Sequence, residues 1–169
     1  GQDYLVCGED YQGLTVVELK TGLRRESIDK DSDKGWGFCS VDFLFNAENQ
    51  VLLIRGCYWG DSYEDRIVDF TDPIARGWSR LECDLSFYED ARKPVFQDDT
   101  VTFFSTPYPT AAQENEWEKE HGEESDFDRT TLPIAASWKL RIEGKKLVLV
   151  ETYMTDEERA RRKRDEEED

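Results

Sequence analysis

Short runs of apolar residues, separated by polar turns, recur along most of this chain, and the clearest example lies in residues 51–70. One continuous apolar run, Val51 to Ile54, opens this stretch, and a second, Ile67 to Phe70, closes it. Short apolar runs bounded by glycine, aromatic and acidic residues are typical of strands. The stretch therefore predicts two antiparallel strands, Val51–Tyr58 and Glu64–Phe70, joined by a loop of unusual composition.

Similar patterns before and after this stretch predict further strands and turns. The other predicted strands are Asp3–Gly8, Leu14–Leu19, Leu23–Ile28, Trp36–Phe45, Trp78–Leu85, 94–96, Thr100–Ser105, Ile134–Ile142 and Leu147–Tyr153. Four short antiparallel strands in about 50 residues match the size of a β-propeller blade. The chain thus predicts an all-β fold of blade-like antiparallel sheets: an opening unit that lacks its first strand, one complete unit, and one enlarged by an insertion. A β-sandwich made from the same strands is the alternative.

The domain organisation follows from where this strand pattern stops. We expect a single all-β domain over residues 1–154, with a polar insertion at 106–131 that contains a surface helix without an apolar face at Ala111–His121. Residues 155–169 predict a short charged helix and a solvated tail, opened by a capping box from Thr155 to Glu158. Propellers usually need at least four blades to close. Fewer than three units indicate either a fragment of a longer protein or sheets that pack without closing.

Charge narrows the class of partner. The chain carries 22 Lys and Arg against 39 Asp and Glu, a formal net charge of −17. Such a charge repels phosphate backbones, so we expect no nucleic-acid binding and favour a basic protein or peptide instead. No apolar run approaches the roughly 20 residues of a membrane span, and no signal-peptide pattern opens the chain. These features predict a cytoplasmic protein that does not enter a membrane; its oligomeric state is left open.

The cysteines and one run of alternating aspartates are the candidate metal ligands in the sequence. The cysteines are far apart and form no C-x-x-C pair, which argues against zinc and favours reduced core thiols over disulfides: Cys7, Cys39, Cys57 and Cys83. Alternating acids at Asp29, Asp31 and Asp33 could present oxygens to calcium. Lys34, however, occupies the place of the glycine that such loops need for their sharp turn. Calcium is therefore kept only as a weak alternative, and no other cofactor is expected.

Four segments resemble a family of uncharacterised bacterial and fungal proteins. They are "DYLVCGEDYQGLTVVELKTG", "GFCSVDFLFN", "GCYWGDSYEDRIVDFTDP" and "FQDDTVTF", and the resemblance covers about residues 3–105. Family members are similar in carrying "YQG-TVVDL-TG", "GFCW", "EGCYWACPYE" and "YDFSDP" in this order, generally after further strand-forming sequence. The resemblance implies the blade-like units and favours a fragment, but it implies no activity. At residues 60–62 this chain has Gly-Asp-Ser where the family tends to have Ala-Cys-Pro.

If the sheets are blade-like, corresponding loops emerge at one end and form a rim of acids and aromatic rings. The candidate ligand-binding residues on this rim are Glu9, Asp10, Tyr11, Tyr58, Trp59, Asp61, Tyr63 and Glu64. Aromatic rings among carboxylates suit a cationic side chain or a sugar ring. The alternative is that Tyr58 and Trp59 pack between sheets while the acids face water.

These residues favour a binding function over catalysis. The chain contains no nucleophile elbow, phosphate-binding loop, HExxH motif or dinucleotide fingerprint. The leading hypothesis is a non-catalytic binding module that uses the rim. The alternatives are a carboxylate-based hydrolase of glycosidase type, which would need two rim acids roughly 5 to 10 Å apart, and an acidic inhibitor of a basic protein.

Overall fold

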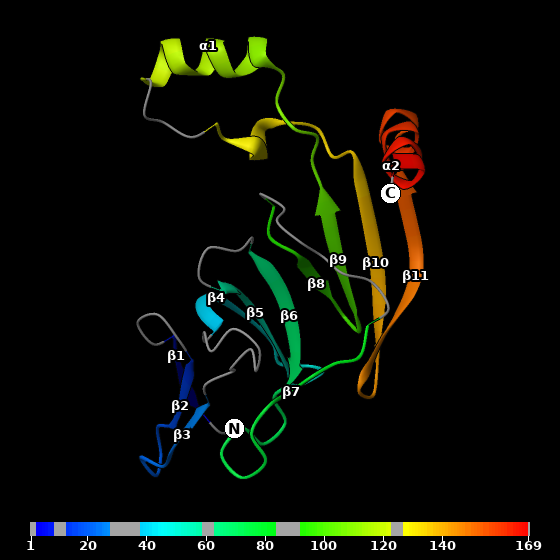
Figure 1. The fold of residues 1–169 in the computed structure, drawn as a ribbon. Helices are drawn as coiled ribbons and strands as arrows, with labels where there is room; N and C mark the ends of the chain where they lie inside the picture. The colour runs from blue at the N-terminus through cyan, green and yellow to red at the C-terminus, as the bar shows by residue number, and fades with distance from the viewer. Residues whose placement is uncertain are drawn as a thin grey trace. The chain divides into compact units, whose positions relative to one another are not determined.

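The computed structural model describes residues 3–8, 13–27, 38–58, 63–83, 92–122 and 127–168 (Figure 1). The described residues form three antiparallel sheets and two α-helices, so the predicted all-β fold with blade-like sheets and a C-terminal helix is confirmed. The chain divides into two compact units, Gly1–Glu89 with Ile142–Leu147, and Asp90–Arg141 with Val148–Asp169. The single domain expected over residues 1–154 stays a prediction.

The first sheet belongs to the first unit and has three strands in the order β1 (Tyr4–Gly8), β2 (Leu14–Glu18) and β3 (Arg24–Ser27). Burial alternates along β2, where Leu14 and Val16 are buried and their neighbours are partly exposed. This alternation follows from the period of two in a strand, which sends successive side chains to opposite faces. One face of the sheet is therefore apolar and packs inside the unit.

The second sheet of this unit is formed by β4 (Phe38–Asn46), β5 (Val51–Tyr58), β6 (Glu64–Asp69) and β7 (Ser79–Arg80), in chain order. The turn between β4 and β5 is fixed by the Asn46 side chain, which accepts hydrogen bonds from the backbone N–H groups of Glu48 and Asn49. This is the local role for which asparagine is favoured in turns. The predicted pairing of the two strands in residues 51–70 is confirmed, with Leu53 opposite Ile67.

The core of the first unit lies between these two sheets. Its buried members come from β2, β4, β5, β6 and the residue after β6: Leu14, Val16, Phe38, Leu52, Ile54, Val68 and Phe70. The β4–β5 register shifts between Ser40 and Asp42. Such a bulge inverts the alternation along a strand, which explains why both Phe38 and Phe43 contact the same core. The sheets come so close together that a side chain on Gly8 would overlap the backbone of Ser40.

The third sheet is formed by β8 (Val95–Gln97), β9 (Thr100–Ser105), β10 (Ala136–Glu143) and β11 (Lys146–Met154), in the order β11-β10-β9-β8. Between β9 and β10 lie α1 (Ala111–His121) and a short 3₁₀ helix (Arg129–Thr131). A complete capping box between Thr110 and Gln113 starts α1, and every residue of this helix is at least partly exposed. The helix at Ala111–His121 therefore has the surface character that the sequence predicts.

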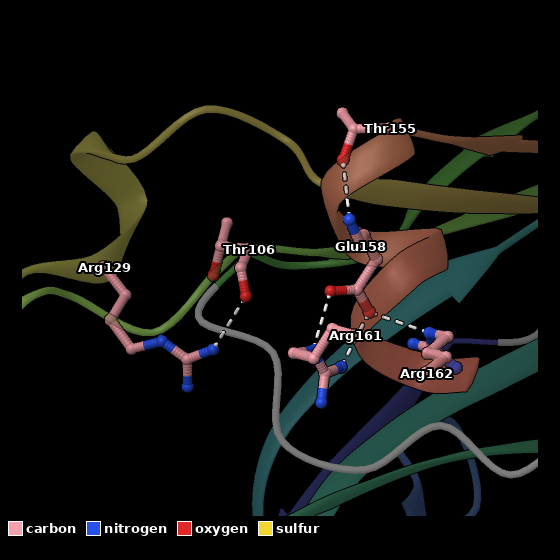
Figure 2. Close-up of polar contacts among 6 residues, drawn as sticks. All are labelled: Thr106, Arg129, Thr155, Glu158, Arg161 and Arg162. Atoms are coloured by element: carbon pink, nitrogen blue, oxygen red, sulfur yellow. Dashed lines mark hydrogen bonds and ion pairs between the residues drawn. The ribbon is translucent and has the colours of Figure 1, made fainter. Parts of the chain in front are cut away.

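The C-terminal helix α2 (Asp156–Glu168) follows β11 directly. The Thr155 hydroxyl accepts a hydrogen bond from the Glu158 backbone at 3.3 Å, as the sequence predicts for a cap (Figure 2). The sequence predicts a fully solvated helix here. The structure differs at Glu158, whose side chain is only 4% exposed. The backbone N–H of Thr155 bonds the carbonyl of Ala135, which ties the helix start to the chain just before β10. Arg161 and Arg162 then cover the carboxylate.

Candidate functional site

Three of the eight predicted rim residues are described in the structure: Tyr58, Tyr63 and Glu64. The others lie outside the described residues: Glu9, Asp10, Tyr11, Trp59 and Asp61. The weak calcium candidates Asp29, Asp31 and Asp33 also lie outside them. The described part of the candidate site surrounds Tyr58 and Glu64.

A pocket of about 410 Å³ lies in the first unit at this end of the strands, and we call it the Arg66 pocket. Its lining residues are Gly13, Leu14, Ser27, Phe38, Ser40, Ile54, Tyr58, Arg66, Val68, Trp78 and Arg80. Gly13, Ser27, Phe38 and Tyr58 directly adjoin the segments 9–12, 28–37 and 59–62 in the chain. The predicted rim loops therefore join the sheets at the lining of this pocket.

Arg66 on β6 is the central polar side chain of the pocket. Its guanidinium carbon lies 3.6 Å from the centroid of the Phe38 ring and 5.1 Å from that of Tyr58. One Arg66 nitrogen donates a hydrogen bond of 3.1 Å to the Tyr58 hydroxyl, and Nε pairs with the Glu64 carboxylate. The Arg66 side chain is only 10% exposed. Burial of a charge at this depth requires such partners, so the ring stack and the ion pair fix the position of the guanidinium.

The pKa of Arg66 depends on two opposing effects, its burial and its polar partners. Burial alone would lower the pKa of Arg66, because it disfavours the charged form. The hydrogen bond that Arg66 donates to Tyr58 and the charge of Glu64 outweigh this effect, and the pKa of Arg66 is raised. Arg66 is consequently a permanent cation at the inner end of the pocket.

Glu64 connects this cation to a second one. Its carboxylate pairs with Arg66 and lies 4.0 Å from a guanidinium nitrogen of Arg80, whose side chain is 54% exposed. Glu64 is thus near both arginines, and both line the pocket. The adjacent pair Arg55–Asp65 is bidentate, at 2.9 and 2.8 Å, but neither residue lines the pocket, and the pair serves to hold β5 and β6 together.

The two interpretations of Tyr58 each describe part of its environment. Its ring packs edge-on against Phe38 at 5.4 Å, while its hydroxyl reaches Arg66 and its side chain lines the pocket. Tyr63 is 43% exposed, next to the start of β6. The structure thus brings Tyr58 and Glu64 to one site and leaves Tyr63 at the surface.

Sequence reasoning missed the arginines and the remaining aromatic walls, Phe38 and Trp78. A signal for Arg66 was present, because Glu64, Arg66 and Val68 alternate on one face of β6 and Val68 is apolar. Arg80 and Trp78 gave no such signal, since they follow β6 only after an irregular connection. Their place at the pocket depends on how that connection folds back.

Neither a metal cluster nor a membrane helix is found within the described ranges. In those ranges, no three His, Cys, Asp or Glu side chains gather closely enough to hold a metal ion. The helices described there are too short or too polar to cross a membrane.

Comparison with protein-family models, with curated proteins and with solved structures finds no match. The function therefore has to be inferred from the pocket itself.

Proposed function

We propose that this protein is a non-catalytic binding protein and that the Arg66 pocket takes a ring-shaped ligand bearing a carboxylate, such as an acidic sugar. The observation that carries the proposal is the position of Arg80, which lines the pocket, is 54% exposed and lies 4.0 Å from the Glu64 carboxylate. At that distance the Arg80 guanidinium makes no short hydrogen bond to Glu64 and can bind the carboxylate of a ligand. Arginine is well suited to this role because its planar fork can bind a carboxylate with two parallel hydrogen bonds.

The walls of the pocket favour a ring. Tyr58 and Trp78 supply aromatic surface on which the apolar face of a sugar can pack, while Ser27 and Ser40 supply hydroxyl groups. The volume of about 410 Å³ lies within the range of small-molecule sites. Of the two arginines, Arg80 is the more exposed, so it is the one placed to meet an incoming ligand.

The expectation of a cationic ligand or basic partner rested on the acids of the rim. Among the described members of that rim the one acid is Glu64, and it is already paired with Arg66. The described lining supplies no carboxylate pair of the kind that a glycosidase needs. For these reasons the proposal is binding without catalysis; the hydrolase and the acidic inhibitor stay predictions from the sequence.

Calorimetric titration with glucuronate, glucose and lysine tests the proposal. We expect glucuronate to bind, glucose to bind more weakly and lysine not to bind. Arg80→Gln should weaken glucuronate binding by about tenfold, because a charge-assisted hydrogen bond contributes about 1.5 to 3 kcal/mol. Arg76→Gln removes the same charge from an exposed site outside the lining and serves as the control.

Equal weakening by both substitutions would mean that only the net charge matters and would contradict the site. Absence of glucuronate binding to the wild-type protein would reject the proposal outright. A carboxylate without a sugar ring, such as benzoate, distinguishes recognition of the acid from recognition of the sugar.

A further inference from the structure

A second pocket of about 490 Å³ lies in the first unit, and we call it the Phe70 pocket. It is lined by Asp3, Tyr4, Val6, Phe45, Ala47, Gln50, Leu52 and Phe70. These residues come from the start of β1, the end of β4, the β4–β5 turn, the start of β5 and the residue that follows β6. The Arg66 pocket is lined from the start of β4 and the end of β5. The two pockets thus lie at opposite ends of the same strands and share no lining residue.

Three aromatic rings form much of the Phe70 pocket. Phe70 is the buried member, 3% exposed, and the rings of Tyr4 and Phe45 both meet it edge-on, with centroids 5.9 Å away. Phe45 is 46% exposed, although it is a large apolar side chain. The position of the turn beneath these rings is fixed, because the Phe70 N–H donates to the Gln50 carbonyl. This hydrogen bond holds the backbone of Gln50 and Phe70, two lining residues of the pocket, together.

The charge around these rings is negative. Asp3 lines the pocket, and none of the eight lining residues is basic. Burial raises the pKa of the Tyr4 hydroxyl, and the nearby carboxylates of Glu18 and Asp72 raise it further. Two acids thus act on Tyr4 and a third, Asp3, lines the pocket, in contrast to the Arg66 pocket with its two guanidinium groups.

We propose that the Phe70 pocket binds an alkylammonium cation, held by the rings of Tyr4 and Phe45, which pack on the buried Phe70, and by the charge of Asp3. Aromatic rings attract a cation placed over their faces, and sites lined by several rings are the usual way in which proteins recognise quaternary ammonium groups. An anion would be repelled by the neighbouring acids, and an uncharged ligand would use the rings but not the charge. The net charge of −17 adds long-range attraction for a cation.

Choline and its uncharged isostere 3,3-dimethylbutanol test this inference in a two-dimensional amide NMR titration. Choline should shift the amide signals of Tyr4, Phe45, Gln50 and Phe70, with a dissociation constant in the millimolar range or below. The isostere has the same shape without the charge and should bind about two- to fivefold more weakly, since an exposed cation–π contact contributes about 0.5 to 1 kcal/mol. Equal binding of the two compounds, or no shift with choline, overturns the proposal.

Two substitutions locate the binding. Phe45→Leu keeps an apolar side chain but removes an exposed ring, and it should weaken choline binding about two- to fivefold. Tyr153→Leu removes a ring of similar exposure, 53%, from β11 and is the matched control with unchanged binding. Asp3→Asn should weaken choline binding but not binding of the isostere. Equal effects of Phe45→Leu on both compounds would mean that the pocket recognises apolar surface and not charge.

The chemistry recognised could belong to a free cation or to a side chain of a basic partner. A short peptide with one trimethyllysine distinguishes the two sources. Affinity equal to that of choline identifies the head group as the whole ligand, whereas affinity about tenfold higher identifies a peptide. Arg80→Gln should leave choline binding unchanged, so failure of this inference is distinguishable from failure at the Arg66 pocket.

Discussion

The guanidinium of Arg66 lies flat enough against the ring of Phe38 to bring its central carbon within 3.6 Å of the ring centroid. Phe38 begins β4 and Arg66 is in the middle of β6, so β5 lies between their strands in the sheet. The contact therefore spans the central strand and closes the end of the core where the pocket opens. It makes Arg66 part of the fold as well as part of the proposed site.

Arg66→Met tests the structural part of this role. Methionine keeps most of the contact with Phe38 but loses the bonds to Tyr58 and Glu64 and leaves Glu64, 13% exposed, with only the distant Arg80. Removing one partner of a buried pair is costly, so we expect a loss of about 2 to 4 kcal/mol in the free energy of unfolding. Chemical denaturation measures it.

The double variant Arg66→Met with Glu64→Gln serves as the control. It should recover part of the loss, because it removes the carboxylate that the single variant leaves unpaired. If Arg66→Met unfolded at the same midpoint denaturant concentration as the wild-type protein, the network would contribute nothing to stability.

Glu158 gives a prediction about pH. Hydrogen bonds from Arg161 and Arg162 hold the pKa of this carboxylate below its usual range, although burial opposes the shift. A group with a lowered pKa in the folded state stabilises the protein above its unfolded pKa, and this contribution is lost as pH falls through the folded value. The contribution of Glu158 should therefore be complete at neutral pH and fade below about pH 4.3.

Comparison with Glu158→Gln isolates this effect from the other acids. At pH 7 the substitution should cost about 1 to 2 kcal/mol, since the two arginines are more than 40% exposed and can be hydrated again. The difference between the two proteins should shrink as the pH is lowered from 5 to 3. A difference in unfolding free energy that is constant over this range contradicts the lowered pKa.

Gly56 in β5 is predicted to tolerate no side chain. A β-carbon there would overlap the carbonyl oxygen of Cys39 and the ring of Phe38. We expect Gly56→Ala to cost about 3 kcal/mol or more, because backbone of the neighbouring strand has to move. Gly144→Ala is the contrast: nothing lies within 4 Å of its β-carbon, and only its positive φ of 62° opposes the change. That strain costs about 1 to 2 kcal/mol. Thermal unfolding should therefore show a lower midpoint temperature for Gly56→Ala than for Gly144→Ala.

Cys39 and Cys57 lie directly opposite each other on β4 and β5, and both are thiols in the structure. Opposite residues in an antiparallel pair have Cα atoms about 4.5 to 5.5 Å apart, within the range that a disulfide spans. Mild oxidation with diamide should therefore join these two cysteines in preference to Cys7 or Cys83. Peptide mapping by mass spectrometry identifies the pair, and a predominant cross-link to Cys7 or Cys83 would contradict the register.

The arrangement of strands could be predicted from the sequence because its causes are local. Alternation along Leu14–Glu18, the apolar run at Val51–Ile54 and the asparagine turn at Asn46 each depend on residues a few positions apart. The same local signals gave the three units of strands and the cap at Thr155. Short apolar runs bounded by turn residues favour strands over other backbone conformations.

Only part of the candidate site could be predicted from such local signals in the sequence. The sequence pointed to the end of the strands where Tyr58 and Glu64 meet the Arg66 pocket, but it emphasised the acids and not the arginines. The burial of Arg66 against Phe38, residues 28 positions apart, is determined by the bulge in β4 and the pairing of three strands. Glu158 was expected in water because its neighbours in sequence are charged, but contacts with the arginines one turn later cover it. Whether a charged side chain is buried depends on which partners the folded chain brings to it, and only the tertiary structure decides that.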